Sequence, residues 1–198
     1  MRLQPLIVPG WKGSGPLHWQ TRWQARLPRA TRVEQDDWEA PTRSAWVTAL
    51  TEAIENASRP PLLIAHSLGC ITVVHLPLPI RQHIAGALLV APADVERNGT
   101  PPALRDFAPI AATPLPFPSI VVASTDDPYC SLSRAETFAA SWGSELVVVR
   151  DAGHLNDASD LGDWPEGLRL LTSLRRRACW RVPVATARIA AMPPVRHG

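Results

Sequence analysis

The sequence is poor in cysteine and has no long apolar run, and these absences exclude several classes of protein. Its 198 residues contain three cysteines, Cys70, Cys130 and Cys179. This odd number, without a Cys-x-x-Cys pair, predicts neither a disulfide scaffold nor a zinc site. No apolar run approaches the length of a membrane span, and Pro9-Gly10 interrupts the first such run, so no secretory leader is expected. We therefore expect a soluble, cytoplasmic protein with free thiols.

A strong excess of charge of one sign is also missing. Twenty Lys and Arg residues stand against 18 Asp and Glu residues, which leaves a net charge of +2. A nucleic-acid-binding protein would be expected to concentrate positive charge, so no nucleic-acid partner is predicted. The sequence also lacks His-x-His and His-x-x-x-His spacings, which disfavours a metal-dependent hydrolase. No metal and no cofactor are predicted.

The length and composition fit one globular domain with a sizeable core. Hydrophobic residues make up 45% of the chain and charged residues 19%, which is too apolar for a disordered protein. We place one α/β domain at residues 1–177 and a loosely ordered tail at 178–198. The boundary follows Arg175-Arg176-Arg177, a run typical of a solvated helix end. No pattern in the sequence indicates the oligomeric state.

Short apolar runs rich in Val, Ile and Leu alternate with helical patterns along the chain. Most of these runs are apolar throughout, as is typical of strands covered on both faces of a parallel sheet. The alternation predicts a three-layer α/β sandwich with a mostly parallel sheet. Strands are expected at 3–8, 62–65, 87–91, 120–123 and 146–149, with a weaker candidate at 31–34, and helices at 17–27, 43–56, 68–76, 133–141 and 165–175. The proline-rich segment 94–118 is predicted to be a functional or disordered loop.

The strongest local motif is Ala65-His66-Ser67-Leu68-Gly69, which lies between a predicted strand and a predicted helix. A small residue, any residue, Ser, any residue and Gly form the nucleophile elbow, where a sharp turn exposes the serine oxygen. The alternative is a structural serine that caps the following helix. Because the motif has the strand-to-helix context that the elbow needs, Ser67 is predicted to be a catalytic nucleophile.

A nucleophilic serine needs a base, and six histidines compete for that role. In this type of fold the chain order is serine, acid and then histidine, each on a loop after a strand. His154 alone follows a predicted strand in that order, and Gly153 before it permits a tight turn. His66 lies inside the elbow and is expected to pack in the core. His154 is therefore the predicted general base.

The acid that orients the base is expected on the loop after the strand at 120–123. Asp126 and Asp127 both stand there, after Ser67 and before His154 in the chain. Either can complete the triad, in which case the other forms the turn; Asp94, after the preceding strand, is a weaker substitute. Pro128 pushes the backbone of Asp127 toward an extended conformation. The residue types leave the choice between the two neighbours open.

An oxyanion hole is the fourth part that acyl transfer requires. The backbone N–H directly after the nucleophile, that of Leu68, is one expected donor. The other is expected from the glycine-rich loop 9–15, with Trp11 as the donor. This loop matches neither of the glycine patterns that bind phosphates, which favours the oxyanion role. We also expect Trp11 and the segment 94–118 to flank a mainly apolar substrate cleft.

Several motifs together resemble the small serine hydrolases typified by retinoblastoma-binding protein nine and bacterial YdeN. The matching segments are Pro9-Gly10-Trp11, Gly13-Ser14-Gly15-Pro16, His18-Trp19-Gln20, the elbow, Asp126-Asp127-Pro128, Gly153-His154-Leu155-Asn156 and the segment 161–167. The resemblance extends to about Arg175 and implies a compact α/β-hydrolase with little or no cap. It also implies a triad of Ser67, Asp127 and His154, which decides between the two aspartates. Pro77 and Pro79 after the elbow helix, and the tail beyond Arg177, depart from the family pattern.

The resulting expectation is a serine hydrolase that cleaves small carboxylic esters or reactive amides through an acyl-enzyme. One alternative is a protein-binding module on a hydrolase fold, which the family's historical name suggests and which would give the chain a protein partner. The other is acyl transfer or thioester cleavage on the same fold. Because one fold hosts many chemistries, the natural substrate does not follow from the sequence.

Overall fold

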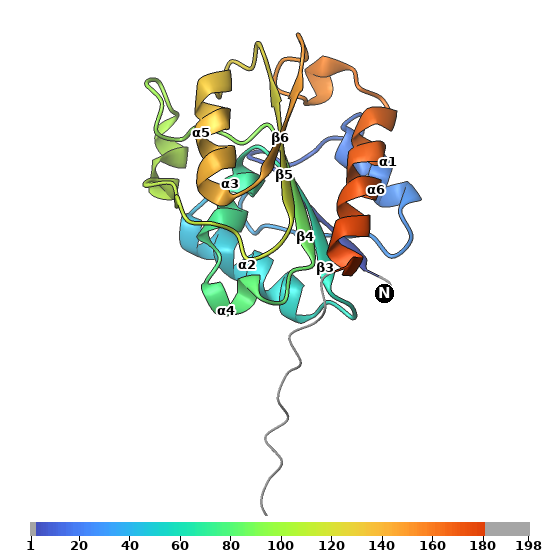
Figure 1. Cartoon of the computed structure of the whole chain (residues 1–198). Helices are drawn as coiled ribbons and strands as arrows, with labels where there is room; N and C mark the ends of the chain where they lie inside the picture. Colours follow the sequence, from blue (N-terminus) through green and yellow to red (C-terminus); the bar gives the residue numbers. More distant parts are fainter. Residues whose placement is uncertain (1–2, 181–198) are drawn as a thin grey trace, which may run out of the picture.

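The computed structural model describes residues 3–180, which form a parallel β-sheet between two layers of helices (Figure 1). The six strands are ordered β2-β1-β3-β4-β5-β6, and every neighbouring pair is parallel. They are β1 (Gln4–Val8), β2 (Thr31–Arg32), β3 (Pro61–His66), β4 (Gly86–Val90), β5 (Ser119–Ser124) and β6 (Glu145–Val149). The predicted three-layer architecture with a parallel sheet is confirmed.

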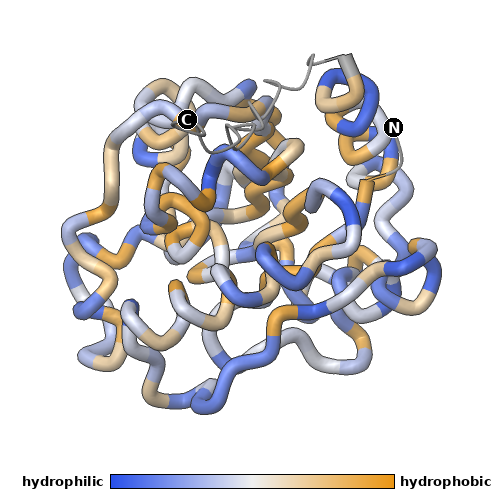
Figure 2. The backbone as a smooth tube through the Cα atoms, turned by 90° about the horizontal axis from the view of Figure 1, so that it is seen from below, coloured by the Kyte–Doolittle hydropathy of each residue, from blue (hydrophilic) through white to orange (hydrophobic). Residues whose placement is uncertain are grey.

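The helices cover both faces of the sheet and shield the central strands from water. They are α1 (Trp19–Arg26), α2 (Arg43–Glu55), α3 (Leu68–His75), α4 (Leu78–Arg81), α5 (Leu132–Trp142) and α6 (Pro165–Trp180), with short 3₁₀ helices η1 (Pro102–Phe107) and η2 (Asp157–Ser159). Helices α1 and α6 pack on one face, while α2, α3 and α5 lie on the other (Figure 1). Hydrophobic segments run through the interior, and hydrophilic ones lie mostly at the periphery (Figure 2).

Two apolar clusters, one on each side of the sheet, form the core. Strands β3, β4 and β5 are buried along their whole length, which explains why their sequences are continuously apolar. Four of the tryptophans are fully buried: Trp19 and Trp23 on one face, and Trp46 and Trp142 on the other. Aromatic side chains of this size contribute a large share of the apolar area that folding removes from water.

The helices differ from the sequence-based expectations at their ends. Helix α1 begins at Trp19 instead of residue 17, because the His18 side chain accepts a hydrogen bond from the Gln20 N–H and caps the helix. Helix α4 was not predicted, since it has four residues and contains Pro79. Helix α6 continues to Trp180, past the helix end expected at residue 175 and the domain boundary expected at residue 177. The rest of the expected tail, residues 181–198, lies outside the described residues.

The segment 94–118 has a defined conformation along its whole length and includes η1. The side chain of Arg134 in α5 forms ion pairs with Asp94 and Glu96 at its start. Leu104, Phe107 and other apolar residues further along it are buried against the core. These contacts fix the segment next to the carboxyl end of the sheet. Of the two predicted alternatives, a functional or a disordered loop, the disordered one is wrong.

The start of α3 is held unusually close to the end of β1. An ideal Cβ placed on Gly69 would lie 2.5 Å from the Pro9 carbonyl oxygen and even nearer to that of Val8. Only glycine fits here, because real Cβ atoms essentially never approach backbone oxygens so closely. The contact brings the elbow and the loop after β1 together at one edge of the sheet. Within residues 3–180, no helix is long and apolar enough to cross a membrane.

Candidate active site

Ser67 stands at a sharp turn between β3 and α3. Its backbone has φ of 54° and ψ of −122°, a conformation that non-glycine residues rarely adopt and that serves here to project the side chain. The Ser67 N–H donates to the Val90 carbonyl oxygen at 3.0 Å, which holds the turn in place. The Ser67 side chain makes no capping hydrogen bond to α3. The alternative interpretation as a helix-capping serine is therefore wrong.

The predicted histidine and one of the two aspartates meet Ser67 at the carboxyl end of the sheet. His154 Nε2 lies 2.9 Å from Ser67 Oγ. His154 Nδ1 lies 2.8 Å and 3.0 Å from the two carboxylate oxygens of Asp127. Because a carboxylate only accepts hydrogen bonds, the ring proton is assigned to Nδ1. Nε2 is then free to accept the Ser67 hydroxyl proton, which is the arrangement of an activated serine.

Asp126 has a different position from its neighbour. Its Oδ1 accepts hydrogen bonds from Ser124 Oγ at 2.6 Å and from the Gly153 N–H at 2.8 Å. These two hydrogen bonds, first from Ser124 and then from Gly153, lower the pKa of the Asp126 carboxyl. Asp126 thereby connects the end of β5 to the loop that carries His154. The carboxyl group of Asp94, the substitute acid, pairs with Arg134 instead of His154.

Two backbone N–H groups flank Ser67 where an oxyanion hole is expected. Among the described residues, neither the Trp11 N–H nor the Leu68 N–H donates a hydrogen bond within the protein. The loop that carries Trp11 is close to the serine, because an ideal Cβ on Gly10 would lie 2.7 Å from Ser67 Cβ. The Trp11 indole N–H donates to the Glu39 carbonyl oxygen at 2.9 Å and anchors the loop. Both predicted donors therefore make no hydrogen bond within the described residues, and the loop that carries Trp11 lies close to Ser67.

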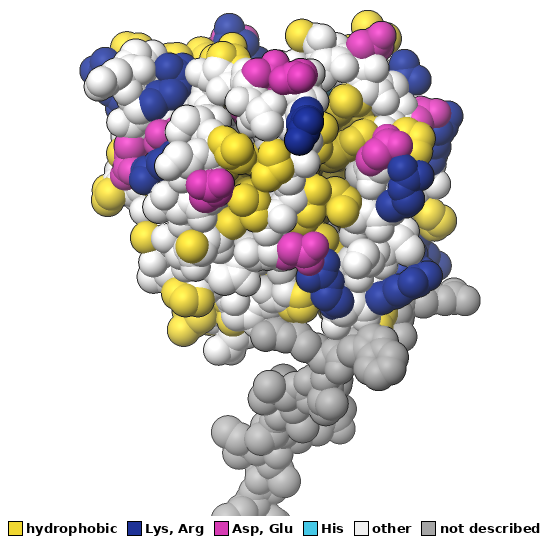
Figure 3. Space-filling view, turned by 45° about the horizontal axis from the view of Figure 1, so that its top comes forward, with side chains coloured by type: hydrophobic (Ala, Val, Ile, Leu, Met, Phe, Trp, Pro, Cys, Tyr) yellow, Lys and Arg dark blue, Asp and Glu magenta, His cyan; other side chains and the backbone are white. Residues whose placement is uncertain are grey.

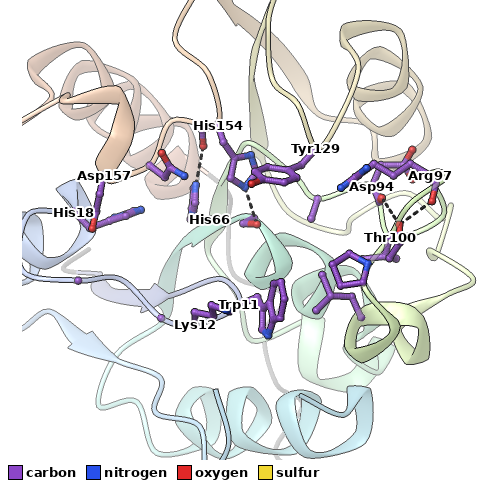
Figure 4. A pocket seen from close by; sticks show the side chains of 18 residues that line it. Trp11, Lys12, His18, His66, Asp94, Arg97, Thr100, Tyr129, His154 and Asp157 are labelled. Carbon is purple, nitrogen blue, oxygen red and sulfur yellow. Dashed lines mark hydrogen bonds between the residues drawn. The ribbon is translucent and has the colours of Figure 1, made fainter. Parts of the chain in front are cut away.

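A cavity of about 550 Å³ opens at Ser67 (Figure 4). Trp11 and the residues Val95, Thr100 and Leu104 line one part of it, so the two segments expected to flank the cleft do line this cavity. On the face turned forward in Figure 3, hydrophobic side chains gather near the centre and charged side chains surround them. Among residues 3–180, no group of three or more His, Cys, Asp or Glu side chains is arranged to hold a metal ion.

Three residues that sequence reasoning did not place in the site also face this cavity. Tyr129 packs edge-on against the His154 ring, with 4.6 Å between the ring centroids. His66 Nε2–H donates to the His154 carbonyl oxygen at 3.0 Å, so it supports the loop that carries His154 besides packing in the core as expected. His18 lies next to His66, with 4.8 Å between the centroids. Each of the three residues lies in or directly after one of the family motifs, which is the signal that the sequence offered. The contacts between them could not be inferred from the sequence.

Comparison with known proteins places the chain in a family. A family model described as serine hydrolase matches residues 5–173. The chain belongs to this serine hydrolase family. The resemblance noted in the sequence is thereby confirmed, and the chain is a hydrolase.

Several solved structures have the same fold as this chain. A YdeN-like hydrolase from Pectobacterium atrosepticum is 34% identical, with a TM-score of 0.80 over 89% of this chain and 92% of that chain. The ydeN gene product of B. subtilis is 21% identical, with a TM-score of 0.70 over 88% and 100% of the two chains. Est1E from Butyrivibrio proteoclasticus is 13% identical and shares the fold, with a TM-score of 0.62 over 86% and 88%. None of the curated proteins matches the chain.

The buried histidines of this hydrolase make its stability depend on pH. Burial, with a smaller contribution from the nearby charges of Arg32 and His154, lowers the pKa of His18 from 6.5 to about 4. Burial and the two neighbouring histidines also lower the pKa of His66 well below its ordinary value. The unfolded chain therefore binds more protons than the folded one below pH 6.5, and stability falls as the pH decreases.

For His18 alone, the expected loss between about pH 6.5 and pH 4 is about 3 kcal/mol of unfolding free energy. Denaturant titrations of the wild type and His18→Asn between pH 6.5 and pH 4 measure this loss of unfolding free energy. Asparagine is a good helix cap but does not titrate, so the variant is expected to lose less stability in acid. An identical pH dependence in the two proteins would contradict the assignment.

Proposed function

We propose that this serine hydrolase cleaves small carboxylic esters and reactive amides through an acyl-enzyme formed on Ser67. The observation that carries the proposal is the continuous hydrogen-bonded row of Ser67 Oγ, the His154 ring and the Asp127 carboxylate. The side chains of His154 and Asp127 are 7% and 2% exposed, so bulk water competes little for these bonds. Such a row is the known arrangement for activating a serine at neutral pH.

In the acylation step, Ser67 Oγ attacks the carbonyl carbon of the ester while His154 Nε2 takes the hydroxyl proton. The Trp11 and Leu68 N–H groups stabilise the negative charge that develops on the carbonyl oxygen; one such donor contributes roughly a hundredfold or more in rate. His154 then gives the proton to the leaving alcohol oxygen as the C–O bond breaks. Asp127 holds the ring in the required tautomer and stabilises its transient positive charge.

Deacylation repeats these steps with water as the nucleophile. His154 takes a proton from water, the resulting oxygen attacks the acyl carbon, and the proton returns to Ser67 Oγ as the acid leaves. The proposal of an ester substrate is supported by proteins of the same fold. Est1E has been solved with ferulic acid bound, and another neighbour is described as a thermophilic esterase from Thermogutta terrifontis. No step requires a metal or an organic cofactor.

A fluorophosphonate probe tests the proposal, because it reacts with activated serines. Intact-mass spectrometry is expected to show one label per wild-type chain and none on Ser67→Ala or His154→Ala. The control is Ser133→Ala, since Ser133 is an exposed serine of α5 outside the site; this variant should label like the wild type. A folded wild type that takes no label, or a Ser67→Ala variant that still does, would overturn the proposal.

A further inference from the structure

His18 presents a buried polar atom that the protein itself does not satisfy. The His18 side chain lines the cavity at Ser67 and the residue is 3% exposed. Its Nε2 atom is buried and has no hydrogen-bond partner within the described residues. A buried polar group without a partner is unfavourable and uncommon in folded proteins. A ligand in the cavity that supplied the partner would regain this lost interaction.

The hydrogen bond at the other ring nitrogen determines what kind of partner is missing. His18 Nδ1 accepts from the Gln20 N–H at 3.1 Å, so Nδ1 carries a lone pair. Burial lowers the pKa of His18 to about 4, and the ring is neutral at physiological pH. The one ring proton is therefore on Nε2. The unsatisfied atom is an uncharged N–H donor, and it needs an acceptor.

No acceptor of the nearest ring lies within hydrogen-bond distance of His18 Nε2. The His66 ring lies edge-on to His18, and its own Nε2–H is already donated to the His154 carbonyl oxygen. An aromatic face is at best a weak acceptor. The rings of His18, His66 and His154 follow one another with 4.8 Å and 5.0 Å between neighbouring centroids. This row, whose three residues Figure 4 labels, places the His18 ring at the same cavity as Ser67 but away from the reacting bond.

The surroundings of this donor favour a neutral acceptor. Gly15 and Asp157 line the same cavity, and the Asp157 carboxylate lies 3.0 Å from where a Cβ on Gly15 would be. That negative charge opposes a carboxylate ligand, while the positive charge of Arg32 near His18 opposes a cationic one. A carbonyl oxygen is uncharged, accepts strongly and matches a single N–H donor.

We propose that His18 Nε2–H binds a second carbonyl oxygen of the substrate, so that this hydrolase prefers esters that carry a ketone or amide carbonyl beyond the scissile one. The inference rests on the proposed ester hydrolysis and specifies its substrate class. A site built to hydrogen-bond one substrate group discriminates against analogues that lack the group. His18 is a specificity-determining residue in this proposal, because its N–H does not touch the reacting atoms.

Matched ester pairs test the preference. One series consists of nitrophenyl esters of oxoalkanoic acids, with the ketone three to six carbons beyond the ester carbonyl, each compared with the alkanoate of equal length. A second series has the ketone in the alcohol part, as oxoalkyl acetates compared with alkyl acetates. For at least one position, kcat/KM of the wild type is expected to be about tenfold higher for the ketone ester than for its partner, as one hydrogen bond can provide.

The variant His18→Asn is expected to bring this ratio close to one. Asparagine can still cap α1 through its side-chain oxygen but has no ring Nε2–H; His18→Ser, another good cap, is the second variant if the first folds poorly. The control His75→Asn changes a histidine outside the cavity, which bonds the Phe107 carbonyl oxygen, and should keep the wild-type ratio. The ratio cancels any general loss of active protein.

Two results would overturn the inference while leaving the proposed function intact. One is equal hydrolysis of the ketone and plain esters at every position by the wild type. The other is a ketone preference that both His18 variants retain, which would mean that His18 only supports His66 and His154. If the wild type hydrolyses no ester in either series and takes no fluorophosphonate label, the proposed function itself fails.

Discussion

Replacing Asp127 with asparagine is expected to lower kcat for ester hydrolysis by about ten-thousand-fold. Both carboxylate oxygens of Asp127 accept a hydrogen bond from His154 Nδ1–H. An asparagine amide can donate to Nδ1 instead, which moves the ring proton to Nε2 and removes the acceptor for the Ser67 hydroxyl. The amide also cannot balance the positive charge that the ring acquires during acylation.

The matched variant Asp126→Asn is expected to change kcat by no more than about tenfold. The asparagine oxygen can still accept from Ser124 Oγ and the Gly153 N–H, the two bonds that Asp126 makes, although neutral acceptors bond more weakly. Steady-state kinetics with a nitrophenyl ester measure both variants, and circular dichroism checks that they fold. If Asp126→Asn caused the larger loss, the acid of the triad would be misassigned.

Replacing Gly69 with alanine is expected to lower the unfolding free energy by about 3 kcal/mol and ester hydrolysis at least about a hundredfold. The new methyl group would collide with the Val8 and Pro9 carbonyl oxygens, and neither backbone segment can move without disturbing β1. The loop that carries Trp11 and the turn that carries Ser67 would separate. Their relative position sets the proposed oxyanion hole, so stability and activity should fall together.

Gly162→Ala is the control for this variant. Gly162 has φ of 56° and nothing within 4 Å of an added Cβ, so its replacement should cost only about 1 kcal/mol through backbone strain and should leave catalysis intact. Chemical denaturation and esterase kinetics on both variants separate the two effects. A Gly69→Ala variant as stable and active as the wild type would show that α3 is not held against β1 as described.

The sheet and most of the candidate site could be predicted from the sequence because they depend on local patterns. The central strands are buried and continuously apolar, and the motifs around Ser67, Asp127 and His154 each follow a strand rich in apolar residues, β3, β5 or β6. Since parallel strands end at the same edge of a sheet, the motifs were expected to meet there. The family match confirms the fold and the hydrolase class, whereas the catalytic roles of the three residues stay predictions until tested.

The parts that the sequence could not reveal depend on contacts between distant segments. Asp126 and Asp127 have the same chemistry, so the residue types did not distinguish them; the family resemblance favoured Asp127, and the reason lies in the directions of the two side chains. Residue 18 was expected inside a helix, but it caps α1 and meets His66 across the sheet edge. The ion pairs of Arg134 with Asp94 and Glu96 likewise join segments about 40 residues apart; no periodicity or propensity encodes such pairings.

The cavity wall formed by residues 95–104 belongs to a different part of the chain from Ser67, His154 and Asp127. That wall follows β4, whereas Ser67, Asp127 and His154 follow β3, β5 and β6. Insertions or substitutions there can reshape the space offered to a substrate without moving the three residues to which we assign bond cleavage. Changes confined to this one continuous segment can therefore alter which substrates fit the cavity, while the reaction stays the same.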